Sequence, residues 1–167
     1  MSRGRGAGAV AELYDRHSPA LLLYARQWVG TAEAEDVVQR VFVGLIAGGK
    51  VPAEARTWLF RCVRNEAMGV LRSGRRRGRR EGEVAAARRE WFEARPDDPL
   101  NAVEAQAALE GLPGELREVV ALRLWGDLTL QDIAEIVGAA VSTVHGRYET
   151  AMEMLRKRLE TPCRKKS

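Results

Sequence analysis

The sequence is poor in the residues that build disulfide scaffolds and active sites. Its 167 residues include only two cysteines, two histidines and 6% aromatic side chains. Cys62 and Cys163 are too few for a disulfide framework or a cysteine-based metal site, and such a count fits a reducing compartment. The sequence contains no Ser/His/Asp or Cys/His residues in a local pattern typical of a catalytic site. It also contains no phosphate-binding glycine loop and no acidic metal cluster. We therefore expect no enzymatic activity, no cofactor and no metal.

Long apolar runs and strand patterns are missing as well. No window approaches the roughly 20 apolar residues of a membrane-spanning helix, and no apolar signal segment follows the basic N-terminus MSRGRGAGAV. We expect a cytoplasmic protein without membrane insertion. No segment alternates as a strand does, whereas apolar residues often recur every three or four positions. The sequence predicts an all-α protein, and its length allows one fair-sized or two small domains.

Positive charge is concentrated rather than abundant. The chain has 27 Lys and Arg against 23 Asp and Glu, with a pI near 9.4. One cluster comprises Arg72, Arg75, Arg76, Arg77, Arg79 and Arg80, and a second comprises Arg156, Lys157, Arg158, Arg164, Lys165 and Lys166. Such clusters favour polyanions, although solvated or disordered basic segments have the same composition.

Residues 128–159 have the pattern of a helix-turn-helix. Thr129 followed by Asp132 predicts a helix N-terminus, and an apolar face then repeats until Gly138 ends the helix. A second stripe predicts a longer helix and comprises Val141, Val144, Tyr148, Ala151, Leu155 and Leu159. The outward side near its start carries Ser142, Thr143, His145 and Arg147. These groups suit phosphates and base edges in a major groove, while a solvated helical hairpin remains the alternative interpretation.

The first half of the chain predicts four helical segments, over residues 9–17, 19–29, 32–47 and 52–72. Ser18-Pro19 separates the first two as either a break or a kink. In the third segment, an apolar stripe comprises Val38, Val41, Phe42 and Leu45, and Val37 and Ile46 widen it. Either one broad face is buried, or the helix uses one face for the core and another for a partner.

The fourth segment has two different sides. Leu59, Cys62 or Val63, Ala67 and Val70-Leu71 form its apolar side. The other side holds Arg61, Arg64, Asn65, Met68 and Arg72, and the arginine cluster follows past the expected helix end. Such a strip can follow a nucleic-acid backbone. Trp58 near its start can stack on a base, but packing in the core is the preferred interpretation.

The character of the chain changes between residues 81 and 98. The segment EGEVAAARREWFEARPDD is mixed in charge and poor in periodic apolar residues, so we interpret it as a flexible linker. Asp98-Pro99 then predicts a new helix N-terminus. The expected organisation is a helical domain over residues 1–80, a linker over 81–98, and a helix-turn-helix domain with a basic tail over 99–167.

Four motifs in this order resemble the extracytoplasmic-function class of bacterial sigma factors, which keep only the second and fourth conserved sigma regions. AEDVVQRVF at residues 34–42 resembles the polymerase-binding helix, and TWLFRCVRNEA at 57–67 with the arginine cluster resembles the −10 element. Residues 108–138 and 142–159 resemble the −35 reader. The resemblance covers nearly the whole chain. It implies a promoter-specificity subunit of RNA polymerase that has two small helical domains and no catalytic activity.

The resemblance implies roles for individual residues. Four residues match family positions that contact the clamp helices of the largest polymerase subunit: Asp36, Val38, Gln39 and Phe42. We expect Phe42 to anchor that contact. Arg61 and Asn65 match positions that touch the melted −10 strand, while Thr143, Val144 and Arg147 match the recognition helix. Together with residue chemistry, the DNA-binding set is Arg61, Arg64, Asn65, Arg72, Arg75, Arg76, Arg77, Ser142, Thr143, His145 and Arg147.

The implied partners are core polymerase, duplex DNA at −35 and single-stranded DNA at −10. An anti-sigma factor is a further partner that the resemblance allows. The chain departs from the family pattern at Arg40, where a glutamate is usual, in the loop of residues 49–52, at Ala140, and at His145-Gly146. The alternative function is a stand-alone helix-turn-helix regulator that binds duplex DNA without polymerase. The broad-faced helix and the basic strip of the first domain would have no evident purpose in such a protein.

Overall fold

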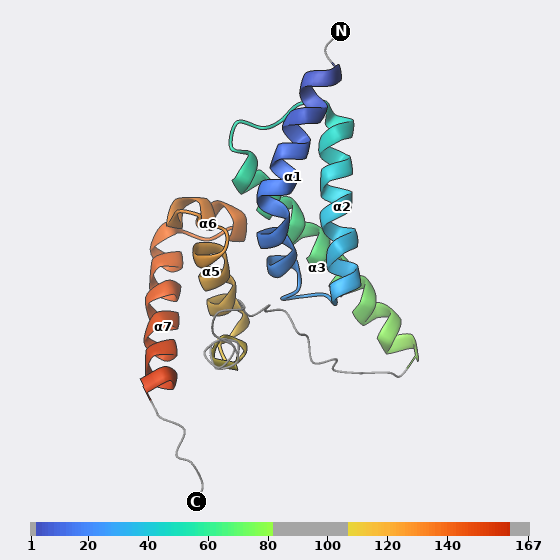
Figure 1. Ribbon diagram of the computed structural model, residues 1–167. Helices are drawn as coiled ribbons and strands as arrows, with labels where there is room; N and C mark the ends of the chain where they lie inside the picture. The colour runs from blue at the N-terminus through green and yellow to red at the C-terminus, as the bar shows by residue number, and fades with distance from the viewer. Residues whose placement is uncertain (1–2, 82–106, 161–167) are drawn as a thin grey trace, which may run out of the picture. The chain divides into compact units, whose positions relative to one another are not determined.

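The computed structural model describes residues 3–81 and 107–160, and every element in them is helical (Figure 1). The chain forms two compact units, Met1–Trp91 and Phe92–Ser167. The predicted all-α fold of two small helical domains is therefore confirmed. The predicted linker falls almost wholly outside the described residues, and the expected boundary at residue 80 lies inside a helix. None of the described helices combines the length and apolar content that crossing a membrane would require.

Three helices form the first unit: α1 (Arg3–Ala25), α2 (Thr31–Gly48) and α3 (Ala55–Glu81). Each packs against the other two. Their shared core includes Leu21, Tyr24, Val37, Val38, Leu59, Phe60 and Val63, all of which are at most 2% exposed. Tyr24 lies edge-on against Trp28 and Phe60, with ring centroids 4.7 and 5.3 Å apart. This core fixes the directions in which the remaining faces of α2 and α3 point.

Two helices differ in length from the predicted segments, and of the two alternatives left open at Ser18-Pro19 the break is excluded. Pro19 lies within the continuous helix α1, so Ser18-Pro19 does not break the chain into two helices. Packing of the residues on either side offsets the hydrogen bond that proline cannot donate. The helix ends at Ala25, and a hydrogen-bonded turn continues to Val29, whose N–H donates to the Ala25 carbonyl. In contrast, α3 does not end near Arg72 but continues to Glu81. Arginine has a high intrinsic helix propensity, and a helix can contain isolated glycines.

The second unit contains α5 (Gly114–Leu124), α6 (Leu130–Val137) and α7 (Val141–Glu160), preceded by helical residues 107–110. The predicted start of α6 is confirmed as a capping box. The Asp132 N–H donates to Thr129 Oγ1 at 3.1 Å, and the Thr129 N–H donates to Asp132 Oδ2 at 3.0 Å. Gly138 ends α6 in the left-handed conformation at φ 68°, as predicted. The helix-turn-helix is therefore present.

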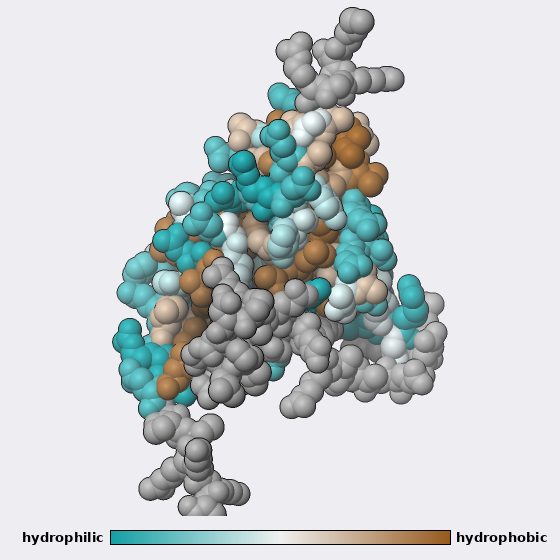
Figure 2. Space-filling model, in the orientation of Figure 1, coloured by the Kyte–Doolittle hydropathy of each residue, from teal (hydrophilic) through white to brown (hydrophobic). Residues whose placement is uncertain are grey.

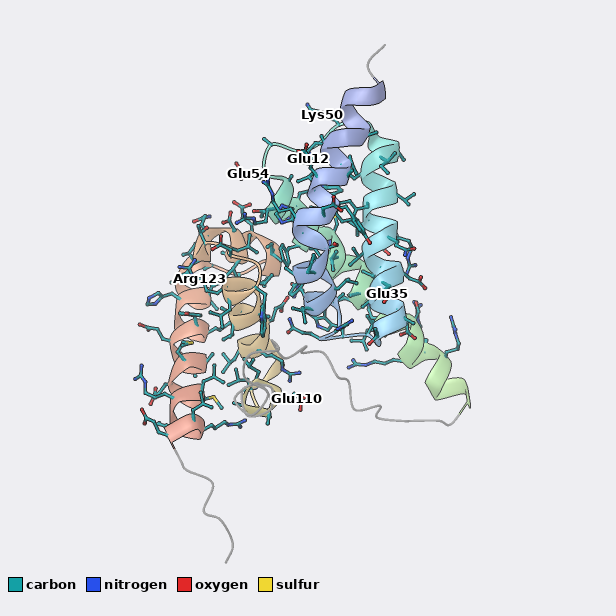
Figure 3. All side chains as sticks on the ribbon, viewed as in Figure 1. Glu12, Glu35, Lys50, Glu54, Glu110 and Arg123 are labelled. Atoms are coloured by element: carbon teal, nitrogen blue, oxygen red, sulfur yellow. The ribbon has the colours of Figure 1, made fainter. Side chains whose placement is uncertain are left out.

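Arginines of the second unit hold its backbone together. Arg123, labelled in Figure 3, donates from Nη1 to the Leu128 carbonyl at 2.7 Å and so ties α5 to the loop before α6. Arg158, near the end of α7, donates to the carbonyls of Ala108 and Gly111 at 3.3 and 2.8 Å. The sequence placed Arg158 in a basic cluster for polyanions. In the structure its guanidinium instead satisfies carbonyls at the end of a helical turn.

Candidate functional site

Helix α2 separates the four residues expected to bind polymerase onto opposite sides. Asp36 and Gln39 are exposed, but Val38 is 1% and Phe42 is 5% exposed. The Phe42 ring lies edge-on against Tyr14, with centroids 5.0 Å apart. The expected non-core face of α2 therefore does not include Phe42, because its apolar stripe faces α1 and the core. Val38 lies on the same buried side, and the expected role of both residues in binding polymerase stays a prediction.

The outward face of α2 carries two apolar residues that the sequence had assigned to no partner. Val43 is 64% and Ile46 is 62% exposed. They follow Asp36 and Gln39 at helical spacing, so the four side chains share one face. Figure 2 shows hydrophobic surface toward the C-terminal end of α2, at the upper right of the view. We call Asp36, Gln39, Val43 and Ile46 the α2 outer face. The widened stripe thus contains both a core side and an exposed side.

The basic strip on α3 is longer than the sequence predicted. Arg61, Asn65, Arg72 and Arg76 are exposed and recur at intervals of four or seven residues along one side. Arg75 and Arg77 are also exposed, whereas Arg64 is half-buried. Because α3 continues through the arginine cluster, these cations extend along a rigid helix instead of a loop. The predicted DNA-binding residues of the first unit therefore lie along one element.

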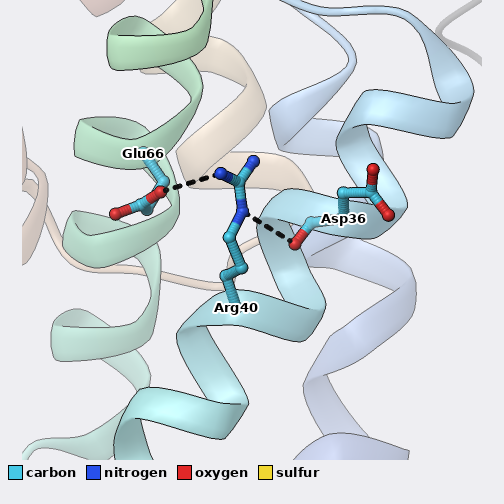
Figure 4. A network of polar contacts seen from close by, with 3 residues as sticks. All are labelled: Asp36, Arg40 and Glu66. Atoms are coloured by element: carbon cyan, nitrogen blue, oxygen red, sulfur yellow. Dashed lines mark hydrogen bonds and ion pairs between the residues drawn. The ribbon is translucent and has the colours of Figure 1, made fainter.

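A groove lies between α2 and α3 beside this strip. Arg40 and Glu33 line it from α2, and Asn65, Glu66, Arg72 and Arg76 are among the residues that line it from α3. Arg40 Nη1 lies 4.0 Å from Glu66 Oε2, and Arg40 Nε donates to the Asp36 carbonyl at 3.4 Å (Figure 4). The Asp36 carboxylate points away from Arg40 in this view. The sequence identified Asn65 and Arg72, but missed that Arg40 and Glu66 border the same groove.

The first turns of α7 present three of the four predicted −35 residues outward. Ser142, Thr143 and His145 are exposed, while Val144 between them is fully buried in the unit. His145 Nδ1 lies 3.5 Å from the Glu149 carboxylate one turn later. This carboxylate was not identified from the sequence, although its spacing of four residues is a readable signal.

Arg147 has a different environment from the other three. Its Nη2 lies 3.0 Å from Glu115 Oε2 at the start of α5, and its side chain is 26% exposed. It follows the buried Val144 by three residues and therefore sits at the flank of the exposed face that carries Ser142, Thr143 and His145. The structure thus gives this guanidinium a partner inside the unit, which the sequence pattern alone had not indicated.

Two titratable side chains of the first unit, His17 and Cys62, are packed rather than exposed. His17 is 8% exposed, and burial lowers the pKa of its imidazole, with the charges of Arg56 and Arg16 adding to the effect. Cys62 is half-buried, and burial raises the pKa of its thiol. Cys62 therefore behaves as the packed thiol that the sequence predicted. In the described parts of the chain, no three His, Cys, Asp or Glu side chains are grouped as metal ligands.

Comparison with known proteins assigns both units. Residues 13–77 match the model of sigma-70 region 2, and residues 102–155 match that of sigma-70 region 4. The chain is 32% identical to the ECF RNA polymerase sigma factor EcfG of Rhodopseudomonas palustris over 148 residues, which cover 82% of this chain and 77% of EcfG. It is 31% identical to the ECF sigma factor SigL of Mycobacterium tuberculosis over 173 residues, covering 96% and 97% of the two chains.

Solved structures agree in fold. The sigma factor RpoE of Bartonella quintana, in complex with the anti-sigma factor NepR, has a TM-score of 0.69 at 24% identity, covering 91% of this chain and 97% of RpoE. CnrH, in complex with the cytosolic domain of CnrY, has a TM-score of 0.62 at 25% identity, covering 93% and 90%. The region 2 match does not favour the alternative of a stand-alone helix-turn-helix regulator. The chain belongs to the ECF RNA polymerase sigma factors of the sigma-70 family.

Proposed function

We propose that this sigma factor binds core RNA polymerase through the α2 outer face, holds single-stranded −10 DNA along α3, and docks α7 on duplex −35 DNA. The proposal places it in the cytoplasm as a non-catalytic specificity subunit. The observation that supports it best is that α2 and α3 of the first unit expose different kinds of surface. One helix exposes an apolar and polar face, while its neighbour exposes a long cationic strip with one amide in it.

Reconstitution with core enzyme tests the whole proposal. Core polymerase with this protein should start transcription at discrete sites on genomic DNA, mapped by run-off transcription, whereas core alone should not. A stand-alone regulator would bind duplex DNA but would neither co-purify with core nor create new start sites. Random initiation indistinguishable from that of core alone would contradict the proposal.

The α2 outer face suits a protein partner more than DNA. Val43 and Ile46 expose apolar surface beside Gln39, which can hydrogen-bond at the edge of a contact. Protein interfaces concentrate binding energy in a few apolar anchors ringed by polar groups. The nearby Asp36 adds a negative charge, which would repel a phosphate backbone. These features support assigning the face to polymerase, with Asp36 and Gln39 retained from the sequence prediction.

Truncating the two apolar residues should weaken holoenzyme formation. We expect the double variant Val43→Ala/Ile46→Ala to bind core roughly tenfold more weakly, which corresponds to about 1.4 kcal/mol. Both side chains are mostly exposed, so the unfolding midpoint should change little. Core affinity is measured by fluorescence anisotropy of labelled protein. Leu159→Ala is a control, since Leu159 is 56% exposed on the other unit. Equal core affinity for the wild type and the double variant would remove this face from the interface.

Asn65 is the member of the α3 strip able to read a base. Arginines neutralise phosphates, whereas an amide offers both donors and an acceptor to an unstacked base edge. Asn65 is exposed, directly precedes Glu66 in the sequence, and borders the groove between α2 and α3. We propose that a −10 base docks here once the duplex opens. The surrounding cations Arg61, Arg72 and Arg76 would hold the backbone on either side.

Replacing Asn65 by Ala should impair opening more than initial binding. We expect roughly tenfold fewer permanganate-reactive thymines at −10 and a relaxed base preference there, because a good base contact contributes about 1–3 kcal/mol of discrimination. Core affinity and closed-complex formation should stay near wild type. Arg72→Ala is the matched control on the same strip, and it should weaken DNA binding without changing base preference. Full opening with unchanged preference in Asn65→Ala would contradict the assignment.

Recognition of −35 DNA is assigned to the exposed first turns of α7. Ser142, Thr143 and His145 can reach base edges and phosphates in a major groove. Arg147 can reach a phosphate only by exchanging its contact with Glu115, so we give it a flanking role. RpoE of Bartonella quintana is bound by an anti-sigma factor. We propose that a similar inhibitor can regulate this protein.

A further inference from the structure

We infer that Arg40 is a phosphate ligand for the DNA strand held between α2 and α3, and that its ion pair with Glu66 is a resting contact which DNA displaces. The inference rests on the proposed function of the α3 strip. Arg40 would then bind DNA, although it lies on α2, the helix whose outer face is proposed to bind polymerase. No local sequence pattern associates Arg40 with the strip, since 26 positions separate it from Glu66.

The Arg40 side chain points from α2 toward α3. The guanidinium leaves α2 toward α3, where Nη1 lies 4.0 Å from the Glu66 carboxylate, and Nε donates to the Asp36 carbonyl (Figure 4). Arg40 therefore lines the groove together with Asn65 and Arg72. The α2 outer face is built from Asp36, Gln39, Val43 and Ile46, and Arg40 sits at its edge. A ligand in the groove would meet this guanidinium directly.

The groove is lined by more cationic than anionic side chains. Its lining includes the guanidinium groups of Arg40, Arg72, Arg76 and Arg77 against the carboxylates of Glu33 and Glu66, which leaves a positive balance. A phosphate suits such a balance, because a guanidinium can bind two of its oxygens with parallel hydrogen bonds. Glu66 alone would repel a nucleic-acid backbone beside Asn65. Arg40 counters that repulsion in the free protein by pairing with it.

The weakness of the ion pair makes exchange feasible. The Arg40 and Glu66 side chains are 56% and 47% exposed, and their charged atoms are at the outer limit of ion-pair distance. Exposed pairs of this kind contribute little to stability, because solvent screens them and both side chains stay flexible. A phosphate in the groove can therefore draw Arg40 away from Glu66 without disturbing the packing of α2 on α3.

The test measures binding of reconstituted holoenzyme to a fluorescein-labelled single strand, the non-template strand of a promoter mapped with the same holoenzyme. Affinity is determined over a series of salt concentrations. Arg40→Ala should bind about three- to tenfold more weakly, and its salt slope should be smaller by about 0.7, the value for one phosphate contact on a single strand. Arg40→Lys should keep the wild-type slope. Glu66→Gln should bind more tightly, since it removes the carboxylate that competes for Arg40.

Core affinity of each variant is measured in parallel and should equal that of the wild type. If Arg40→Ala lowers core affinity while the salt slope of the holoenzyme is unchanged, Arg40 belongs to the polymerase interface and the inference is wrong. It is also wrong if Arg40→Ala and Glu66→Gln both bind the strand like the wild type. A wild-type protein that forms no complex with core would refute the proposed function, and this inference with it.

Discussion

Phe42→Ala is expected to destabilise the first unit by about 3–5 kcal/mol, the usual cost of removing a buried aromatic ring. The ring is 5% exposed and contacts Tyr14 edge-on at 5.0 Å between centroids, so its loss leaves a cavity between α1 and α2. Small domains are stable by only about 5–15 kcal/mol, which makes this loss a large share of the total. Urea unfolding of the full chain, followed by far-UV circular dichroism, should show the earlier transition.

Two matched variants separate core packing from partner binding. Phe42→Leu keeps most of the volume and should cost less than about 2 kcal/mol, with polymerase binding retained. Val43→Ala, one residue further and 64% exposed, should leave the unfolding free energy within about 0.5 kcal/mol of wild type. If Phe42→Ala unfolded like the wild type but bound core poorly, the ring would have to lie at the interface after all.

Phe42 and Val38 are residues for which two kinds of sequence evidence conflict. Apolar periodicity placed both residues on the stripe with Val41 and Leu45, and the structure buries all four. Family resemblance instead placed Phe42 and Val38 at the contact with polymerase. The period of 3.6 residues reports which side of a helix meets the core, and here it was the better guide. Resemblance in a motif does not say which of its residues face outward.

Features encoded by neighbouring residues were predicted well. The Thr129–Asp132 capping box and the stop at Gly138 depend on side chains or backbone angles within one turn, so their signals are contained in short segments. The length of α3 was harder to predict. Arginine favours helix intrinsically, but Gly74 and Gly78 lower that preference, and no capping signal marks where the helix ends.

Contacts between distant segments could not be predicted from the sequence. Arg40 meets Glu66 because α2 and α3 pack side by side, and Arg147 meets Glu115 because α7 packs on α5. Neither pair has a local signature, since charged residues are common on every helix of the chain. Both pairs change the interpretation of a candidate site. The residues of a binding surface were therefore partly identifiable, whereas their partners required the packing of the helices.

Gly126→Ala is expected to destabilise the second unit by about 3 kcal/mol, near the upper end for forcing extra atoms into a packed site. A Cβ at residue 126 would lie 2.5 Å from the Leu122 carbonyl oxygen and 3.0 Å from Leu128 Cδ1. The carbonyl belongs to the last turn of α5 and cannot rotate away as a side chain can. Leu128 is 1% exposed, so it has no room to yield without disturbing the core.

The strain falls on the connection that orients the helix-turn-helix. Gly126 lies between α5 and α6, and the next residue, Asp127, already has a positive φ of 49°. Arg123 then binds the Leu128 carbonyl at 2.7 Å, which fixes the path of the loop into Thr129. A shift at Gly126 would loosen this bond and the start of α6 together. Protection of −35 duplex DNA from nuclease should therefore weaken in parallel with stability.

Gly146→Ala is the matched control within the same unit. A Cβ there meets no atom within 4 Å, and the residue lies inside α7, where alanine is more stable than glycine by about 0.5–1 kcal/mol. In differential scanning calorimetry, Gly126→Ala should lower the midpoint of the second unit by roughly 10 °C or more, since each kcal/mol shifts a domain of this size by about 4–8 °C. Gly146→Ala should raise it by a few degrees. Equal midpoints for wild type and Gly126→Ala would mean that the loop accommodates a methyl group, and the close approach to the Leu122 carbonyl would then not explain the glycine.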